Sequence, residues 1–209
     1  MKSNKPIETS HQAMKQDLQS RSGVDKTLLA WMASKTPEQR LKILQNNVTA
    51  ILKARNGRRH ACFSSILEVL TRHEVDFIVV GGVFAVLLGA PVATFDLDIV
   101  HSRSSENLTR LSNALDELNA HYRDNLPKHL EPTLSGLAET DHHLLSTSLG
   151  PLDVWGSIGI DDDYVVLKDR IETVDIKDGL SVKILELDTL IDVKEKAARS
   201  KDNYMLEIL

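Results

Sequence analysis

Apolar residues recur at intervals of three and four along the first third of the chain, which is the spacing of an amphipathic helix. Helices are expected over residues 24–35, 37–55 and 61–74. Thr36, Pro37 and Gln39 stand where an N-cap, a first helical residue and the glutamine of a capping box belong. We therefore predict that the N-terminal part is helical and that its longest helix begins beside Thr36.

The pattern changes after residue 75, where apolar residues become consecutive or alternate with polar ones. Strands are expected over residues 76–80 and 94–102, as a pair within 143–159, and as a hairpin over 171–185. Further helices are expected over residues 83–90, 104–120 and 186–209. Asp178-Gly179 is a dipeptide that favours a hairpin turn. This order predicts an α/β (α+β) fold, a small mixed β-sheet flanked by helices with an N-terminal helical segment.

Composition adds limits on the class of protein. The chain has 209 residues, 42% of them hydrophobic, which suits one domain with an appended segment. We predict a basic helical segment over residues 1–60 and the α/β domain over 61–209. No apolar run approaches the roughly 18 residues of a membrane helix, and the N-terminus lacks the apolar core of a signal peptide. Cys62 is the single cysteine, so no internal disulfide can form. These features predict a cytoplasmic protein with no membrane segment.

The net charge of −5 hides a strong asymmetry between the two parts. Residues 1–60 hold 12 Lys and Arg against 4 Asp and Glu, whereas residues 61–209 hold 13 against 26. Four basic side chains cluster near the end of the helical segment: Lys53, Arg55, Arg58 and Arg59. Such an arm indicates either an anionic partner such as nucleic acid or a helix face that docks on the acidic body of the same chain.

Two aspartates stand one residue apart in an apolar run, at Asp96 and Asp98. Side chains two positions apart on a strand share a face, so these carboxylates would repel and at least one pKa would rise. A divalent cation such as Mg²⁺ relieves this repulsion because hard cations take carboxylate oxygens. Asp153, on a later predicted strand between apolar neighbours, is the candidate for a third carboxylate. The alternative is that each aspartate ends a strand or pairs with a lysine.

Gly81 and Gly82 end the strand over residues 76–80 and precede a predicted helix. Backbone N–H groups at a helix N-terminus suit a phosphate, and glycine lets the backbone approach a ligand closely. A pair of glycines alone is also compatible with a plain tight turn. Together with Asp96, Asp98 and Asp153, however, it indicates a site for a phosphorylated ligand and a metal.

The stretches FIVVGGVFAVLLGAPVATFDLDIV and STSLGPLDVWGSI resemble the signature of the DNA polymerase beta-type nucleotidyltransferase superfamily. The likeness is greatest to small prokaryotic members akin to the AbiEii/MenT-type toxins. It covers roughly residues 74–205, with a weaker part in LIDVKEKAARSKD, and leaves residues 1–60 outside.

The resemblance implies a metal-dependent enzyme that moves a nucleotidyl group from an NTP to a hydroxyl acceptor. The implied catalytic residues, which would also hold Mg²⁺ or Mn²⁺, are Asp96, Asp98 and Asp153. The residues implied at the nucleotide are Gly81, Gly82, Thr94, Lys194, Arg199, Lys201 and Asp202. A role like that of the toxins implies RNA, such as tRNA, as acceptor and an antitoxin protein as partner, while other relatives transfer nucleotides to proteins or small molecules.

Two departures from the family pattern leave alternatives open. Val92 stands where relatives often carry an arginine, and Met205 stands where they often carry a second acid after the C-terminal Lys-Asp. One alternative is a catalytically degenerate nucleotidyltransferase fold that binds an NTP or a partner without turnover. Another is an interaction module in which the N-terminal helices form a dimerisation arm.

Two further clusters are expected to have ordinary roles. His142-His143 is expected as an exposed loop pair, with a place in the acceptor site as the alternative. The acids at 161–163 are expected at a helix N-terminus, where the helix dipole favours negative charge.

Overall fold

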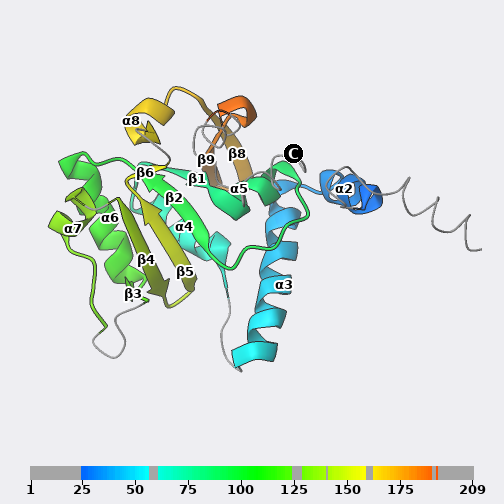
Figure 1. The fold of residues 1–209 in the computed structure, drawn as a ribbon, viewed down its shortest axis with the longest axis horizontal. Coiled ribbons are helices and arrows are strands. Elements are labelled where there is room, and N and C mark those ends of the chain that lie inside the picture. Colours follow the sequence, from blue (N-terminus) through cyan, green and yellow to red (C-terminus); the bar gives the residue numbers. More distant parts are fainter. Residues whose placement is uncertain are drawn as a thin grey trace, which may run out of the picture.

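The computed structural model describes residues 25–56, 61–123, 129–139, 141–158, 162–189 and 192. Its main sheet has seven strands in the order β3-β4-β5-β2-β1-β9-β8, and a two-stranded sheet joins β6 to β7 (Figure 1). The strands are β1 (Phe77–Val80), β2 (Leu97–His101), β3 (His121–Tyr122), β4 (His142–Thr147), β5 (Gly150–Trp155), β6 (Ser157–Ile158), β7 (Asp162–Asp163), β8 (Ile171–Lys177) and β9 (Leu180–Leu185). The predicted α/β class with a mixed sheet is confirmed.

Helices surround this sheet, with α6 and α7 beside its β3–β4 edge and α3 beside α5 (Figure 1). The helices are α2 (Lys26–Ala33), α3 (Pro37–Asn56), α4 (Phe63–Arg72), α5 (Gly81–Leu88), α6 (Ser105–Glu117), α7 (Leu134–Glu139) and α8 (Tyr164–Leu167). Strand β3 and helix α7 fall in a stretch, 121–142, whose sequence gives only a weak signal. Within the described ranges, none of the helices combines the length and the apolar character needed to cross a bilayer.

The predicted capping box at the start of α3 is confirmed. The Thr36 backbone N–H donates to Gln39 Oε1 at 3.1 Å, and the Gln39 N–H donates to Thr36 Oγ1 at 3.3 Å. These reciprocal bonds satisfy two donors that a helix N-terminus otherwise leaves open. Ser104 caps α6 in a similar way by accepting from the Asn107 N–H. Local sequence therefore fixes where both helices begin.

The sheet combines antiparallel and parallel pairs around β2. Strand β1 runs antiparallel to β2 and parallel to β9, while β2 runs parallel to β5. Two hairpins, β4–β5 and β8–β9, flank the β2–β1 pair, and β3 forms the edge beside β4. The second hairpin turns at Gly179, whose φ is +79°, as the Asp178-Gly179 pair predicts.

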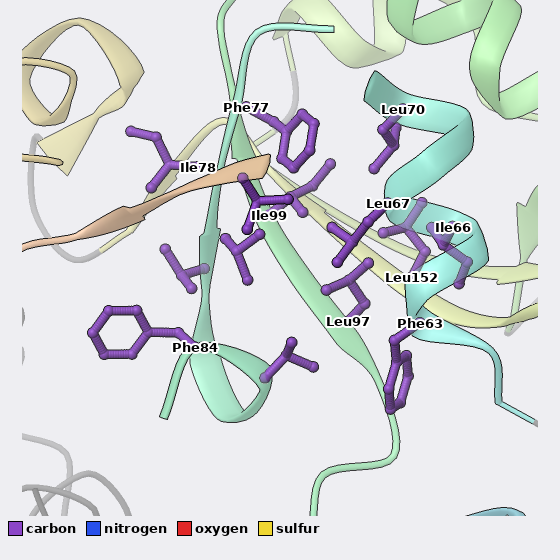
Figure 2. Packing of buried hydrophobic residues seen from close by; sticks show 14 of the residues in the cluster. Phe63, Ile66, Leu67, Leu70, Phe77, Ile78, Phe84, Leu97, Ile99 and Leu152 are labelled. Carbon is purple, nitrogen blue, oxygen red and sulfur yellow. The ribbon is translucent and has the colours of Figure 1, made fainter. Parts of the chain in front are cut away.

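One face of the central strands packs against α4. Figure 2 shows the side chains of α4 meeting those of the strands, and the buried residues labelled there on these elements are Phe63, Ile66, Leu67, Leu70, Phe77, Leu97, Ile99 and Leu152. Because side chains alternate along a strand, Asp98 and Asp153 point to the opposite face. The same strands thus carry the core on one face and the predicted carboxylates on the other.

The described part of the basic segment packs onto this body. Leu41, Leu44 and Val48 of α3 are buried in the same hydrophobic core as the sheet, and α3 lies against α5 and β8. Burying an apolar helical face in this way contributes roughly 1.5–3 kcal/mol for each large side chain. The opposite, polar face of α3 stays available to solvent.

Arg40 of α3 joins the ends of two other helices. Its Nε donates to Met32 O at 3.0 Å, Nη2 donates to Ala33 O at 2.9 Å, and Nη1 donates to Leu87 O at 2.6 Å. These carbonyls belong to the last turns of α2 and α5. Carbonyl groups in a last turn have no N–H donor four residues further on within their own helix. A single guanidinium therefore ties the N-terminal helices to α5.

We expect Arg40→Met to lower the free energy of unfolding by about 2 kcal/mol, since hydrogen bonds from a charged donor each contribute roughly 1.5–3 kcal/mol and water replaces part of them. Urea denaturation measures this change. Arg72→Met is the matched control, because Arg72 is 60% exposed and only pairs with Glu117 on the surface. Equal losses in the two variants would show that the contacts of Arg40 are not stabilising.

Candidate functional site

Strand β1 ends next to Asp98 of the neighbouring strand β2. Val80, the last residue of β1, pairs with Asp98 of β2, and α5 begins at the next residue, Gly81. Gly81 has a φ of +67°, and a Cβ atom there would lie 2.2 Å from Asp98 Oδ2. Only glycine fits this position without displacing the carboxylate. The predicted strand-glycine-helix arrangement is confirmed, although the helix starts at Gly81 and not at Val83.

Asp98 and Asp153 lie side by side on neighbouring strands. They are register partners in the parallel pair of β2 and β5, and neighbouring strands lie about 4.8 Å apart. The two side chains share the face opposite α4. The strand register thus brings together two aspartates that are far apart in the sequence, as the prediction of a shared carboxylate site requires.

Asp96 does not lie on the strand, contrary to the strand expected over 94–102. Strand β2 begins at Leu97, and Asp96 occupies a bend before it. The physical reason is the lack of a partner, because β1 already ends opposite Asp98 and Pro151 on the β5 side has no N–H to donate. The alternation argument therefore fails for Asp96.

Thr94 and Gly82 hold this bend in place. Thr94 Oγ1 donates to Asp96 Oδ1 at 2.7 Å, and Thr94 is itself buried. A Cβ atom on Gly82 would lie 2.4 Å from Thr94 Cβ, so the backbone of α5 is in close contact with the bend. Gly82 and Thr94, both predicted at the nucleotide, are brought together beside Asp96.

The surroundings of Asp98 disfavour the ionised form of its carboxyl group. Burial, followed by repulsion from Asp96, raises the pKa of Asp98 to about 6. A hydrogen bond from Trp155 Nε1 to Asp98 Oδ1, at 3.2 Å, and the charge of Arg123 act in the opposite direction. The carboxylate is still ionised at neutral pH, where a nearby cation would stabilise it.

Asp153 is buried, with 5% of its surface exposed, and two basic side chains face it. Arg123 forms an ion pair with Asp153 Oδ1, and His142 Nε2 lies 3.7 Å from Asp153 Oδ2. The His142 ring also stacks on Trp155, with ring centroids 3.4 Å apart. Trp155, which contacts Asp98, therefore connects the surroundings of the two aspartates.

The expectation that His142-His143 forms an exposed loop pair is wrong. Strand β4 begins at His142, which faces Asp153, and His143 is fully buried and bonds through Nδ1 to the Tyr122 hydroxyl at 2.6 Å. Pairing with β5 recruits both residues into the sheet. The sequence does not predict Arg123 as a site residue. It follows the two-residue strand β3, in a stretch whose apolar and polar residues show little periodicity.

The donor set suits a hard divalent cation, since it consists of carboxylate oxygens. Asp96 lies near enough to Asp98 for its charge to raise the pKa of Asp98. Asp153 adjoins them but is directed to Arg123. Among the residues that the structure describes, no three His, Cys, Asp or Glu side chains are gathered as a ready metal site. A cation bound by Asp96 and Asp98 could also bind Asp153 only if the ion pair between Arg123 and Asp153 were broken.

The remaining predicted nucleotide residues, Lys194, Arg199, Lys201 and Asp202, lie outside the described residues. At the other side of the site, Arg55 near the end of α3 lies over the Phe95 ring, with its guanidinium carbon 5.8 Å from the ring centroid. Phe95 directly precedes Asp96 in the chain. A cationic end of α3 is thus placed next to the bend that carries Asp96.

No family model matches this sequence, and no curated protein gives a significant match. Among solved structures, the chain is similar to a crystal structure from Thermotoga maritima whose protein is provisionally assigned as a nucleotidyltransferase. The two share 19% identity with a TM-score of 0.46, and the match covers 69% of this chain and 87% of that one. A likeness of this size does not show the function of this chain.

Proposed function

We propose that this chain is a metal-dependent nucleotidyltransferase that moves a nucleotidyl group from an NTP to a hydroxyl acceptor, either RNA such as tRNA or a protein. The observation that carries this proposal is the register pairing of Asp98 with Asp153 directly beside Gly81. Paired carboxylates next to a glycine-bounded helix N-terminus combine the two needs of phosphoryl transfer, which are charge neutralisation and alignment.

Each residue of the site has a role in this reaction. Asp96 and Asp98 would hold the cation, and the first-turn N–H groups of Gly81 and Gly82 would donate to phosphate oxygens. Bound Mg²⁺ or Mn²⁺ would neutralise the charge of the triphosphate. Asp153 would orient the acceptor hydroxyl and take its proton, while the hydroxyl oxygen bonds to the α-phosphorus and pyrophosphate leaves.

A polyanionic acceptor is favoured by the charges beside the site. Lys53 and Arg55 are exposed at the end of α3, and Arg55 reaches Phe95 next to Asp96. Lys and Arg side chains bind phosphates with little regard to sequence, and this binding weakens as salt is added. An RNA end could therefore lie along α3 and present its hydroxyl to Asp153.

A second candidate function is an NTP-binding protein without turnover. The observation that favours it is the ion pair of Arg123 with Asp153, which occupies the carboxylate that the reaction needs. Asp96 and Asp98 would still be able to hold a cation and its nucleotide. The two candidates differ in whether a covalent product forms.

The test is transfer of label from each radioactive NTP, with Mg²⁺, to total tRNA or to the protein itself. We expect the wild type to label one acceptor and both Asp98→Asn and Asp153→Asn to lower the rate at least a hundredfold. The reason is that removing a group that stabilises charge in the transition state costs roughly 10²–10³ in rate.

Asp175→Asn, the same chemical change on the exposed strand β8, is the control and should keep full activity. Nucleotide binding without any labelled product would favour the second candidate. If the wild type neither binds nor transfers a nucleotide, both candidates are wrong.

A further inference from the structure

We propose that Arg123 is the resident counter-cation of the site, which holds Asp153 in the absence of a divalent cation and competes with that cation for the carboxylate. This inference rests on the proposed function for the presence of a cation site. Beyond that function, the chain places its own positive charge on Asp153, and this charge limits metal binding.

The first support is the burial of Asp153. With 5% of its surface exposed, its charge would be costly without a partner, because an ionised carboxylate loses its hydration in such a place. Arg123 supplies the partner, and its own side chain is only 26% exposed. Arginine keeps its positive charge at every pH at which the protein is folded. The pair is therefore present unless another cation replaces the guanidinium.

The second support is that Arg123 is anchored outside the site. Its backbone N–H donates to Leu144 O at 3.0 Å and its Nε donates to Leu145 O at 3.0 Å, both on β4. These bonds aim the guanidinium across β4 at β5, where Asp153 lies. The position of the charge is thus set by the sheet and does not depend on a ligand.

The third support is the reach of this charge. Arg123 also lowers the pKa of Asp98, so both register-paired carboxylates sense it. The charge of Arg123 thus gives Asp153, and to a smaller extent Asp98, the kind of compensation that a metal ion would provide. Among the described side chains no three-ligand cluster is gathered, and Asp153 faces Arg123 and His142.

Competition follows from this geometry. A divalent cation that uses Asp153 must separate it from Arg123 and would otherwise lie beside a like charge. Removal of the guanidinium should therefore strengthen cation binding, whereas loss of an ordinary structural partner would leave it unchanged or weaken it.

The test measures Mn²⁺ affinity of the full chain, without nucleotide, by electron paramagnetic resonance of free Mn²⁺. We expect Arg123→Gln to bind Mn²⁺ about tenfold more tightly than the wild type, a factor equivalent to about 1.4 kcal/mol. Arg123→Lys should stay near the wild type. Adding Asp153→Asn to Arg123→Gln should remove the gain.

Arg110→Gln is the matched control, since it removes the same charge from a side chain that is 34% exposed and paired with Asp76, at the far end of β1 from Gly81. It should leave Mn²⁺ affinity unchanged. Equal affinity of Arg123→Gln and the wild type, or a gain of the same size in Arg110→Gln, overturns the inference while the metal site stands. If neither the wild type nor Arg123→Gln binds Mn²⁺, the inference falls and so does the metal dependence of the proposed function.

A second measurement uses the wild type and needs no folded variant at position 123. The Arg123 guanidinium N–H groups give their own signals in a ¹H–¹⁵N spectrum, and triple-resonance data assign them. We expect Mg²⁺ to shift the Nη2–H signal and to speed its exchange with water as the guanidinium leaves Asp153. A signal that stays in place while Mg²⁺ saturates the protein overturns the inference.

Discussion

Gly81→Ala is expected to lower the free energy of unfolding by about 3 kcal/mol and to abolish nucleotidyl transfer. Two effects add at this residue. A side chain at a φ of +67° costs roughly 1–2 kcal/mol, and a Cβ atom 2.2 Å from Asp98 Oδ2 forces an overpacking cost of about 1–3 kcal/mol. Because the obstructed atom is the carboxylate oxygen itself, the substitution displaces Asp98 from the position that the proposed reaction needs.

Urea denaturation of three variants separates these effects. Gly179→Ala has a similar φ, +79°, but nothing within 4 Å of the new Cβ, so it reports the backbone cost alone. Gly82→Ala meets Thr94 Cβ at 2.4 Å without a positive φ, so it reports a clash alone. We expect Gly81→Ala to be less stable than Gly179→Ala. If the two lose the same amount, the close approach of Gly81 to Asp98 is not real.

Asp98→Asn is expected to raise the free energy of unfolding of the metal-free protein by about 1–3 kcal/mol at pH 7.5 while removing activity. The stability gain follows from the pKa of Asp98, which burial and the repulsion of Asp96 raise to about 6. A pKa above the ordinary 3.8 means that the native state pays to ionise this carboxyl, by about 1.4 kcal/mol for each pKa unit. Asparagine removes that cost and can still accept the hydrogen bond from Trp155.

The sign of the pH dependence makes this prediction specific. Below pH 3.8 the carboxyl is protonated in both the folded and unfolded chains, so the variant has no advantage. Between pH 4 and 6 the unfolded carboxyl ionises more readily, and the wild type loses stability relative to Asp98→Asn. Above pH 6 the difference is constant. Urea midpoints measured across pH 4.5–8 test this course.

Asp96→Asn provides the matching comparison, because it removes the neighbouring charge without touching Asp98. It should lower the pKa of Asp98, so that adding Asp98→Asn to it brings a smaller gain than in the wild type. A gain from Asp98→Asn that is the same at pH 4.5 and pH 7.5 would refute the assignment of this cost to ionisation.

Sequence alone predicts those parts of the fold that local chemistry determines. The capping box at Thr36 and the Asp178-Gly179 hairpin each depend on a few neighbouring residues, and each is confirmed. Strand β3 and helix α7 were not predicted, because the pairing of β3 with β4 stabilises two residues that carry no strand pattern of their own.

The site residues also differ in whether local sequence is enough to predict them. Gly81 and Asp98 could be located because the strand-glycine-helix and carboxylate patterns are written in consecutive residues. The bend at Asp96 depends on where β1 ends, and the contacts of Arg123 and His142 with Asp153 depend on which strand pairs with β5. Such information comes from strand order, which a single sequence does not display.

The register of β2 against β5 has a consequence for evolution and for engineering. Leu152 faces α4 and Asp153 faces the site, so a slip of one residue would bury a charge in the core and expose leucine in its place. Misaligned folding would therefore destroy stability and function together. A variant of these strands that keeps both aspartates and still folds cooperatively therefore has its carboxylates in the native register, so a folding screen can remove misaligned variants from a library before any chemistry is assayed.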